Sequence, residues 1–284
     1  MIERYDLHTH FRNNWGGGSF SLERDPLIPG FYLDCLKQRG IDGVGLVNFG
    51  ASGKNAYAFE LFRDLCLDKE KVFPYSLVKD LSNALVFKDK GGKTLSVIKA
   101  QEIPTKLPER HDHILAIGLD RDVLIEEGQG ISQTLKKIKS YGAISCPDHP
   151  LCFAGIGEQN LINYCEGFDT WEAYNQNFFN KALKSRLGLN PDEDKVRFLE
   201  GIIGKRGISV SDSHNSKDVG NGFIEVEKID FSSKDNFLGS FKQVFNNNDF
   251  ISGYCKHNSL FSVLSHVFVV YYDGLIRKRF GWCE

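Results

Sequence analysis

Short β-rich runs alternate with helix-like runs along most of this chain, and the alternation restricts the folds that it can adopt. Two of the helix-like runs end at Gly40 and Gly142, as helices commonly do. Strands separated by helices predict a parallel sheet, and seven or eight such repeats favour its closure into a barrel. The predicted strands are residues 3–7, 43–47, 72–78, 95–100, 113–118, 143–146, 168–174 and 208–211, and the predicted helices are residues 31–38, 56–67, 131–141, 160–165 and 193–204.

We expect a single domain over residues 1–284, a length that one large α/β domain can fill. Residues 88–93 contain two adjacent glycines and predict a hairpin or loop tip before the next strand. From about residue 222 to residue 284 we expect further strands and a closing helix that pack against the barrel.

Charge, cysteines and apolar runs exclude several classes of protein. The formal charge of −2 gives no overall basic field, so nucleic-acid binding is not indicated. The seven scattered cysteines form no CxxC pair and indicate reduced thiols, not a disulfide framework. No signal-peptide pattern is evident, and the longest apolar run, residues 260–272, is too short to cross a bilayer. We therefore expect a cytoplasmic protein without a membrane partner.

His8 and His10 follow the apolar start of the first predicted strand. Side chains two positions apart on a strand lie on the same face, so the two imidazoles project side by side. Two imidazoles at this spacing can hold one metal ion between them. A surface strand can also carry two histidines by chance, and the pair alone does not decide between these interpretations.

Further polar residues stand beside the ends of other predicted strands. Each of them taken alone is compatible with a solvated residue. However, six of the eight histidines fall at such positions, and the chemistry of barrel proteins collects where the strands end. Imidazoles and carboxylates from separate strands are the ligands expected for zinc, manganese or iron. The candidate ligands and their neighbours are Glu102, His113, His149, Asp212 and His214.

Five motifs, taken in order, resemble those of the PHP (polymerase and histidinol phosphatase) family over roughly residues 1–225. They are Asp-Leu-His8-Thr-His10, Ala-Gln-Glu102-Ile, His113-Ile-Leu-Ala-Ile-Gly, Cys-Pro-Asp-His149-Pro and Ser-Asp212-Ser-His214-Asn. The resemblance implies a distorted (β/α)7 TIM-like barrel with a metal site at the C-terminal rim of its strands. It also implies that one divalent ion is held by His8, His10, Glu102 and Asp212, and that Glu102 bridges to a second ion bound by His113 and His149.

The chain departs from the family pattern at the end of the second predicted strand. Family members usually carry Thr-Asp-His there, whereas this chain has Val47-Asn48-Phe49. A phenylalanine cannot bind a metal ion, and a neutral asparagine is a far weaker ligand than an aspartate. The further histidine that follows the first motif in trinuclear members is also replaced, by the stretch Asn13 to Gly16. We therefore expect two ions and no third site.

The resemblance implies a metal-dependent phosphoesterase that cleaves a small phosphate monoester with metal-activated water. Asp212 would orient or deprotonate the water, and His214 would protonate the leaving alkoxide. Glu172 is either a rim residue or a carboxylate buried against the barrel wall. The predicted substrate contacts are Arg12, Asn48, Lys54, Asn175 and His214.

Two other classes of function remain open. The altered second-strand motif also fits a PHP-fold metal-binding scaffold with little or no catalysis. Related metal-dependent barrel hydrolases cleave C–N or C–O bonds with similar two-metal chemistry, which gives an amidohydrolase-like alternative. The chain has no room for polymerase modules, and the expected partner is a small phosphorylated substrate. The sequence leaves open the substrate, the metal and the oligomeric state.

Overall fold

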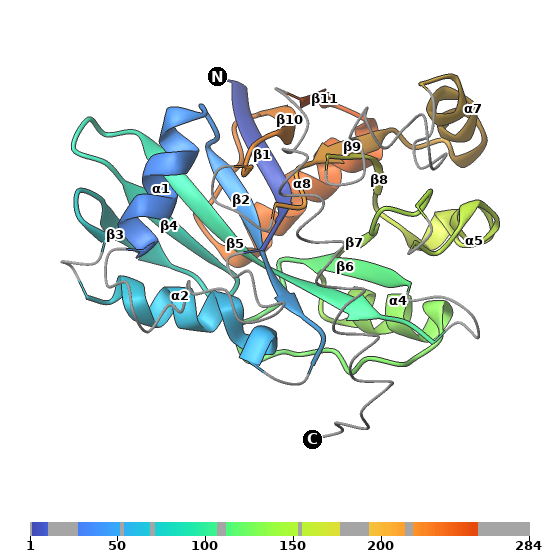
Figure 1. Cartoon of the computed structure of the whole chain (residues 1–284), viewed down its shortest axis with the longest axis horizontal. Helices are drawn as coiled ribbons and strands as arrows, with labels where there is room; N and C mark the ends of the chain where they lie inside the picture. Colours follow the sequence, from blue (N-terminus) through green and yellow to red (C-terminus); the bar gives the residue numbers. More distant parts are fainter. Residues whose placement is uncertain are drawn as a thin grey trace, which may run out of the picture.

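A mixed sheet of nine strands, with a separate pair of strands beside it, carries the fold (Figure 1). The computed structural model describes residues 2–10, 28–51, 54–68, 72–106, 112–152, 155–176, 193–213 and 218–254. The second sheet consists of β8 (Trp171–Asn175) and β9 (Gly207–Val210). The first sheet runs in the order β11 (Ile251–Tyr254), β10 (Gly222–Glu227), β1 (Ile2–Thr9), β2 (Gly43–Phe49), β5 (Thr94–Pro104), β4 (Ala84–Lys88) and β3 (Ser76–Asp80), and β6 (His113–Ile117) joins β5 to β7 (Ile144–Pro147).

The strand directions differ from the predicted parallel sheet. The pairs β1–β2, β2–β5 and β8–β9 are parallel. In contrast, β5 pairs antiparallel with both β4 and β6, β6 pairs antiparallel with β7, and β10 pairs antiparallel with β1. The prediction of a parallel sheet is therefore wrong for these neighbours. The ladders between the described strands do not close the sheet, so the structure does not show the predicted closed barrel.

Two connections explain the antiparallel pairs. Residues 88–93 form a hairpin tip, as predicted, in which the Asp89 carboxylate accepts a hydrogen bond from the Lys93 backbone N–H at 2.8 Å. After β6, residues 118–130 turn back along β5, since the N–H of Lys106 donates to the Gln129 carbonyl at 2.8 Å. The helix α4 (Ile131–Ser140) therefore begins at the edge where β6 began, and β7 returns to that same edge.

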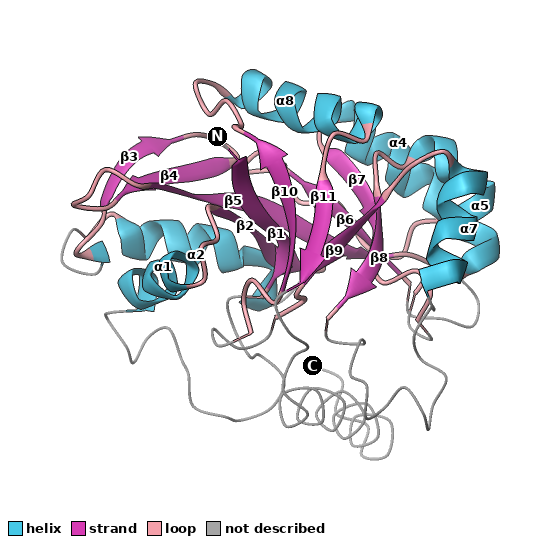
Figure 2. Ribbon diagram, turned by 90° about the horizontal axis from the view of Figure 1, so that it is seen from above, coloured by secondary structure: helices cyan, strands magenta, loops and turns pink. Residues whose placement is uncertain are grey.

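Helices cover both faces of the sheet (Figure 2). The helices α1 (Ile28–Gln38) and α2 (Ala58–Cys66, preceded by the 3₁₀ turn Lys54–Tyr57) lie on one face, where their apolar side chains share a cluster with β2 and β5. The helix α8 (Lys234–Asn247) lies on the other face and packs Phe237, Phe241 and Phe245 against the sheet. Helices α4, α5 (Glu158–Asn163) and α7 (Glu193–Ile203) contribute to a third cluster with β6 and β8.

The helix positions follow the apolar spacing of the sequence. In α4, Ile131, Thr134, Leu135 and Ile138 are buried, which is the i, i+3, i+4, i+7 pattern of one helix face. The helix stops just before Gly142, whose φ of +72° suits a residue without a Cβ. Among the described residues, no helix combines the length and the apolar character needed to cross a bilayer.

The C-terminal part of the described chain forms β10, α8 and β11, which extend the sheet beyond β1. Strands and a helix were expected there, and residues 222–254 contain them. Residues 255–284 lie outside the described part, so the prediction of one domain over the whole chain stays a prediction.

One edge of the fold gathers the ends of several strands. The parallel strands β1, β2 and β5 all end there. The backbone after β9 joins the end of β1, since Thr9 and Ser213 form a parallel bridge and the His10 N–H donates to the Ser213 carbonyl at 2.8 Å. Because β6 is antiparallel to β5, it begins at this edge, and β7 ends at it. We call this the site edge.

Candidate metal centre

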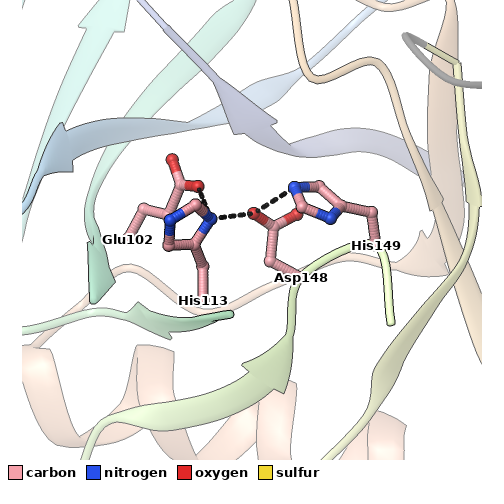
Figure 3. Close-up of side chains that lie close together, drawn as sticks. All are labelled: Glu102, His113, Asp148 and His149. Atoms are coloured by element: carbon pink, nitrogen blue, oxygen red, sulfur yellow. Dashed lines mark ion pairs between the residues drawn. The ribbon is translucent and has the colours of Figure 1, made fainter. Parts of the chain in front are cut away.

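The six predicted metal ligands lie together at the site edge. The structure forms two main groups of side chains, and within each group the potential ligand atoms lie within 4.8 Å of one another. The first group is His8, His10 and Asp212. The second group is Glu102, His113, Asp148 and His149, which Figure 3 shows.

The first group combines the end of β1 with the loop after β9. The Nε2 atoms of His8 and His10 lie 3.0 Å apart. Asp212 Oδ1 lies 3.5 Å from Nε2 of His8 and 3.4 Å from Nε2 of His10. His8 is fully buried and His10 is only 10% exposed, so the three ligand atoms face one another away from bulk water.

Asp6 fixes the loop that carries Asp212. The Asp6 carboxylate is buried and accepts hydrogen bonds from the backbone N–H and the hydroxyl of Ser211 and from the N–H of Gly220, at 3.0, 2.5 and 2.7 Å. The Asp212 N–H in turn donates to the His8 carbonyl at 2.9 Å. Asp212 adopts a φ of +47°, a left-handed conformation that costs energy for a residue with a Cβ. These contacts hold the carboxylate beside the two imidazoles in spite of that cost.

Glu102, at the end of β5, lies between the two groups. Its Oε2 atom is 3.5 Å from Nε2 of His10 and 3.9 Å from Nε2 of His8, whereas its Oε1 atom is 2.7 Å from Nδ1 of His113. Burial raises the pKa of Glu102, but His113, His10 and His8 outweigh burial and hold that pKa well below its ordinary value. An ionised carboxylate with one oxygen directed at each group is suited to bridge two cations.

The second group brings three strands together. Glu102 comes from β5, His113 from the start of β6, and Asp148 and His149 from the loop after β7. Asp148 Oδ2 lies 3.0 Å from Nε2 of His149 and 3.8 Å from Nδ1 of His113, and Figure 3 shows the carboxylate between the two rings. Burial, followed by the nearby Glu172 carboxylate, raises the pKa of Asp148 well above its ordinary value. His149 has a φ of +27°, a second strained residue in the centre.

The close contacts of the second group are not those of a hydrogen-bond network. His113 Nδ1 and both carboxylate oxygens of Asp148 are buried, yet none of these three atoms makes a hydrogen bond within the described part of the chain. Buried nitrogen and oxygen atoms that lie close together without a hydrogen bond call for an explanation, and a cation placed among them would provide one. Imidazole nitrogens and carboxylate oxygens are the ligands of zinc, manganese and iron. The residues present therefore fit divalent metal ions.

The residues predicted to contact substrate have different surroundings in the structure. Asn48 ends up fully buried, with its Nδ2 donating to Glu60 at 2.9 Å and its Oδ1 accepting from the Phe59 N–H of α2 at 2.9 Å. This placement gives Asn48 a structural role and does not support its predicted contact with substrate. Phe49 lies edge-on against the His113 ring, with the ring centroids 5.5 Å apart.

Asn175 is buried at the end of β8, where its Nδ2 donates to Glu172 at 3.0 Å and to Asp212 at 3.2 Å. It therefore lies beside the candidate ligands, and its predicted role in substrate binding stays a prediction. Arg12 and His214 lie outside the described residues, as does the side chain of Lys54.

Sequence reasoning missed Asp148 and left the role of Glu172 open, and both residues are buried next to His8. Nδ1 of His8 lies 2.8 Å from Glu172 Oε1 and 3.3 Å from Asp148 Oδ1, and the three residues form a further group of potential ligands. A signal was present in each case. Glu172 is the second residue of the strand Trp171–Asn175, between the apolar Trp171 and Ala173, and Asp148 lies between Pro147 and His149.

No protein-family model matches the sequence, and no curated protein matches it either. Solved structures do share its fold. PsfC from Pseudomonas syringae PB-5123 matches with a TM-score of 0.57 at 11% sequence identity, covering 97% of this chain and 99% of that chain.

Two further structures match at lower TM-scores. The lesion-specific endonuclease PfuEndoQ from Pyrococcus furiosus has a TM-score of 0.49 at 14% identity, over 87% of this chain and 56% of that chain. A candidate metal-dependent phosphoesterase from Bifidobacterium adolescentis has a TM-score of 0.44 at 10% identity, over 75% of this chain and 88% of that chain. The match to PsfC shows that the mixed α/β fold of this chain occurs in a solved structure.

Proposed function

We propose that this chain is a metal-dependent hydrolase, specifically a phosphoesterase that cleaves a small phosphate monoester. The observation that carries the proposal is the pair of ligand groups at the site edge, with the two oxygens of Glu102 directed at different groups. Paired metal sites of this kind are common in phosphatases and nucleases. The distorted (β/α)7 barrel belongs to the same proposal.

His8, His10, Glu102 and Asp212 would hold one ion. Glu102, His113 and His149 would hold the other, and Asp148 would add a carboxylate to it. Divalent ions in such a site lower the pKa of water and neutralise charge on a phosphoryl group. Zinc, manganese or iron would suit these ligands, and we propose two ions without a third site.

The chain's own residues would orient the reactants. Asn175 donates to Oδ2 of Asp212, so Oδ1 is the atom that Asp212 presents to His8 and His10. That oxygen is suited to orient an attacking water or to take its proton. From the sequence, His214 stays our candidate for the acid that protonates the leaving alkoxide, and Arg12 and Lys54 stay candidate phosphate contacts.

Metal content and turnover together test the proposal. Protein stripped with a chelator and reloaded with Mn²⁺ or Zn²⁺ should bind two ions and hydrolyse p-nitrophenyl phosphate. The single variants His10→Ala and His113→Ala should each lose turnover by more than the roughly 10–100-fold that follows loss of an outer hydrogen-bond partner of a metal ligand. Lys88→Ala, at an exposed position on β4, serves as the control and should keep full activity.

Other outcomes would assign another function. Two bound ions without turnover of any phosphate ester would favour a metal-binding scaffold. Hydrolysis of amides or lactones, but not of phosphate esters, would favour the amidohydrolase-like class. A chain that binds neither manganese nor zinc would contradict the metal centre itself.

A further inference from the structure

Glu172 connects three elements of the metal centre although sequence analysis gave it no defined role. Its side chain lies on β8 and is only 1% exposed. Oε1 lies 2.8 Å from Nδ1 of His8, on β1. Oε2 accepts hydrogen bonds from the His149 N–H at 2.9 Å and from Asn175 Nδ2 at 3.0 Å. One carboxylate therefore contacts one candidate ligand directly and holds the strained backbone of another.

These contacts define the tautomer of His8. An ionised carboxylate can only accept hydrogen bonds, so the ring nitrogen that faces Glu172 must carry the proton. The carboxylate also accepts two hydrogen bonds at Oε2, from the His149 N–H and from Asn175 Nδ2, so both of its oxygens serve as acceptors. With Nδ1 protonated, the neutral His8 ring presents the lone pair of Nε2 to His10 and Asp212. A metal ligand whose other ring nitrogen donates to a carboxylate is a recurring arrangement in proteins.

The contacts continue to the remaining member of the first group. The Nδ2 atom of Asn175 that donates to Glu172 also donates to Oδ2 of Asp212 at 3.2 Å. Glu172 thus influences His8 directly and Asp212 through Asn175, while its link to the second group is the backbone N–H of His149.

We propose that Glu172 is a positioning residue that fixes the His8 tautomer and thereby controls metal binding by His8, His10 and Asp212. The proposal rests on the metal centre of the proposed function and does not depend on the reaction that the centre catalyses.

The variant Glu172→Gln tests this assignment by replacing one carboxylate oxygen with an NH₂ group. The oxygen of a glutamine would be favoured on the side of His149 and Asn175, because two N–H donors point there. Its NH₂ group would then face Nδ1 of His8 and donate to it. His8 would shift to the tautomer with a proton on Nε2, which has no lone pair for a metal ion.

Zinc binding, measured by titration calorimetry and elemental analysis, gives the main readout. In Glu172→Gln one of two Zn²⁺ ions should bind about 10–100-fold more weakly, the range for loss of an outer partner of a metal ligand. Glu166→Gln, the same change at an exposed position, should bind both ions as the unaltered protein does. Adding His10→Ala to Glu172→Gln should weaken no further ion, whereas adding His113→Ala should weaken the second ion as well.

Full zinc affinity in Glu172→Gln would overturn the proposal and leave the proposed function intact. If adding His10→Ala weakened a second ion, Glu172 would act on a different ion and the proposal would fail as well. Two tightly bound ions without phosphate ester hydrolysis would instead overturn the proposed function and leave the role of Glu172 standing.

A spectroscopic measurement on the unaltered protein covers the case in which Glu172→Gln does not fold. Long-range ¹H–¹⁵N correlation spectra distinguish the two ring nitrogens of a histidine, and the His8 signals can be assigned by their loss in His8→Ala. We expect the proton of His8 on Nδ1 in the zinc-loaded protein. A proton on Nε2 would refute the proposal, and it would indicate that His8 binds zinc through Nδ1 with Asp148 and Glu172.

Discussion

Replacing Asp148 with asparagine should raise the stability of the chelator-treated protein and reduce the stabilisation that metal ions give. Both carboxylate oxygens of Asp148 are buried without a hydrogen bond among the described residues. Burial and the neighbouring Glu172 raise the pKa of Asp148, so keeping this carboxylate ionised costs folding free energy. An amide has the same shape without the charge, and its NH₂ group can donate to Nε2 of His149, which lies 3.0 Å from Oδ2.

The expected magnitudes follow from these contacts. Removing a buried acceptor that lacks a partner should stabilise the chelator-treated protein by about 1–3 kcal/mol. At a free metal concentration of about 100 times Kd, one ion stabilises a protein by about 2.7 kcal/mol. A tenfold loss of affinity in Asp148→Asn would remove about 1.4 kcal/mol of that gain.

The stability that Asp148→Asn gains in chelator should also depend on pH. Because the pKa of Asp148 is raised in the folded state, the folded protein favours the protonated form. The unaltered protein therefore loses stability as the pH rises from the ordinary value of 3.8 through the raised pKa, and Asp148→Asn does not. The advantage of the variant in chelator should be small near pH 4 and grow as the pH rises.

Urea unfolding at several pH values, in chelator and in Mn²⁺, measures both the stability of the chelator-treated protein and the stabilisation that manganese adds. Asp122→Asn makes the same change at an exposed position and should shift neither of them. The reasoning would be refuted if Asp148→Asn destabilised the chelator-treated protein, or if manganese stabilised the variant as much as the unaltered chain.

Three further substitutions probe the residues around the centre. Lys99→Met should destabilise the fold by about 3–5 kcal/mol in urea unfolding, because the fully buried ammonium pairs with Glu60 at 2.5 Å and also donates to three backbone carbonyls. Asn48→Ala should cost about 1–3 kcal/mol in the same assay by leaving the Phe59 N–H of α2 without its acceptor, and an unchanged midpoint would argue against this role. Asp6→Ala removes the acceptor of three donors on Ser211 and Gly220, which lie on either side of Asp212. It should therefore lower thermal stability and Zn²⁺ affinity together. Retained Zn²⁺ affinity would show that this loop does not position the metal ligands.

The ligand positions could be predicted because they depend on local sequence patterns. His8 and His10 share a face through the two-residue repeat of a strand, and Glu102 marks the end of an apolar strand. These residues meet because β1, β2 and β5 run parallel, as the alternation of strands and helices predicted.

The direction of β6 and β7 could not be predicted in the same way. For β7 it is set by residues 118–130, which return along β5 and are held there by the buried side chains of Lys99 and Gln101. One clue was present in the sequence. His113 stands at the start of its strand, and such a residue can join side chains from the ends of parallel strands only if its own strand is antiparallel to them.

Asp148 was missed, and the contacts of Glu172 and Asn48 could not be derived, because single polar residues do not reveal their burial. An aspartate in a loop is usually solvated, and only the structure shows that Asp148 lies between two histidine rings. The position of Asn48 indicated the site edge correctly, since β2 ends there. Its side chain nevertheless points to α2, which no spacing rule along the strand predicts.

The charges of the centre give a reason why it contains more carboxylates than the sequence motifs suggested. Glu102, Asp148, Glu172 and Asp212 are all buried around four imidazoles. Four negative charges confined in this way repel one another, whereas two divalent cations carry four positive charges and would balance them. The strained backbones of His149 and Asp212 add to the cost that the fold must meet without bound ions. Ions that bind next to Asp148 would relieve the cost of burying its carboxylate beside Glu172, so part of the metal affinity should arise there. A neutral variant at Asp148 should therefore lose metal affinity while the chelator-treated fold becomes more stable. At Glu102 and Glu172 the neighbouring histidines lower the pKa of the carboxyl, so a neutral variant there should lose both metal affinity and stability.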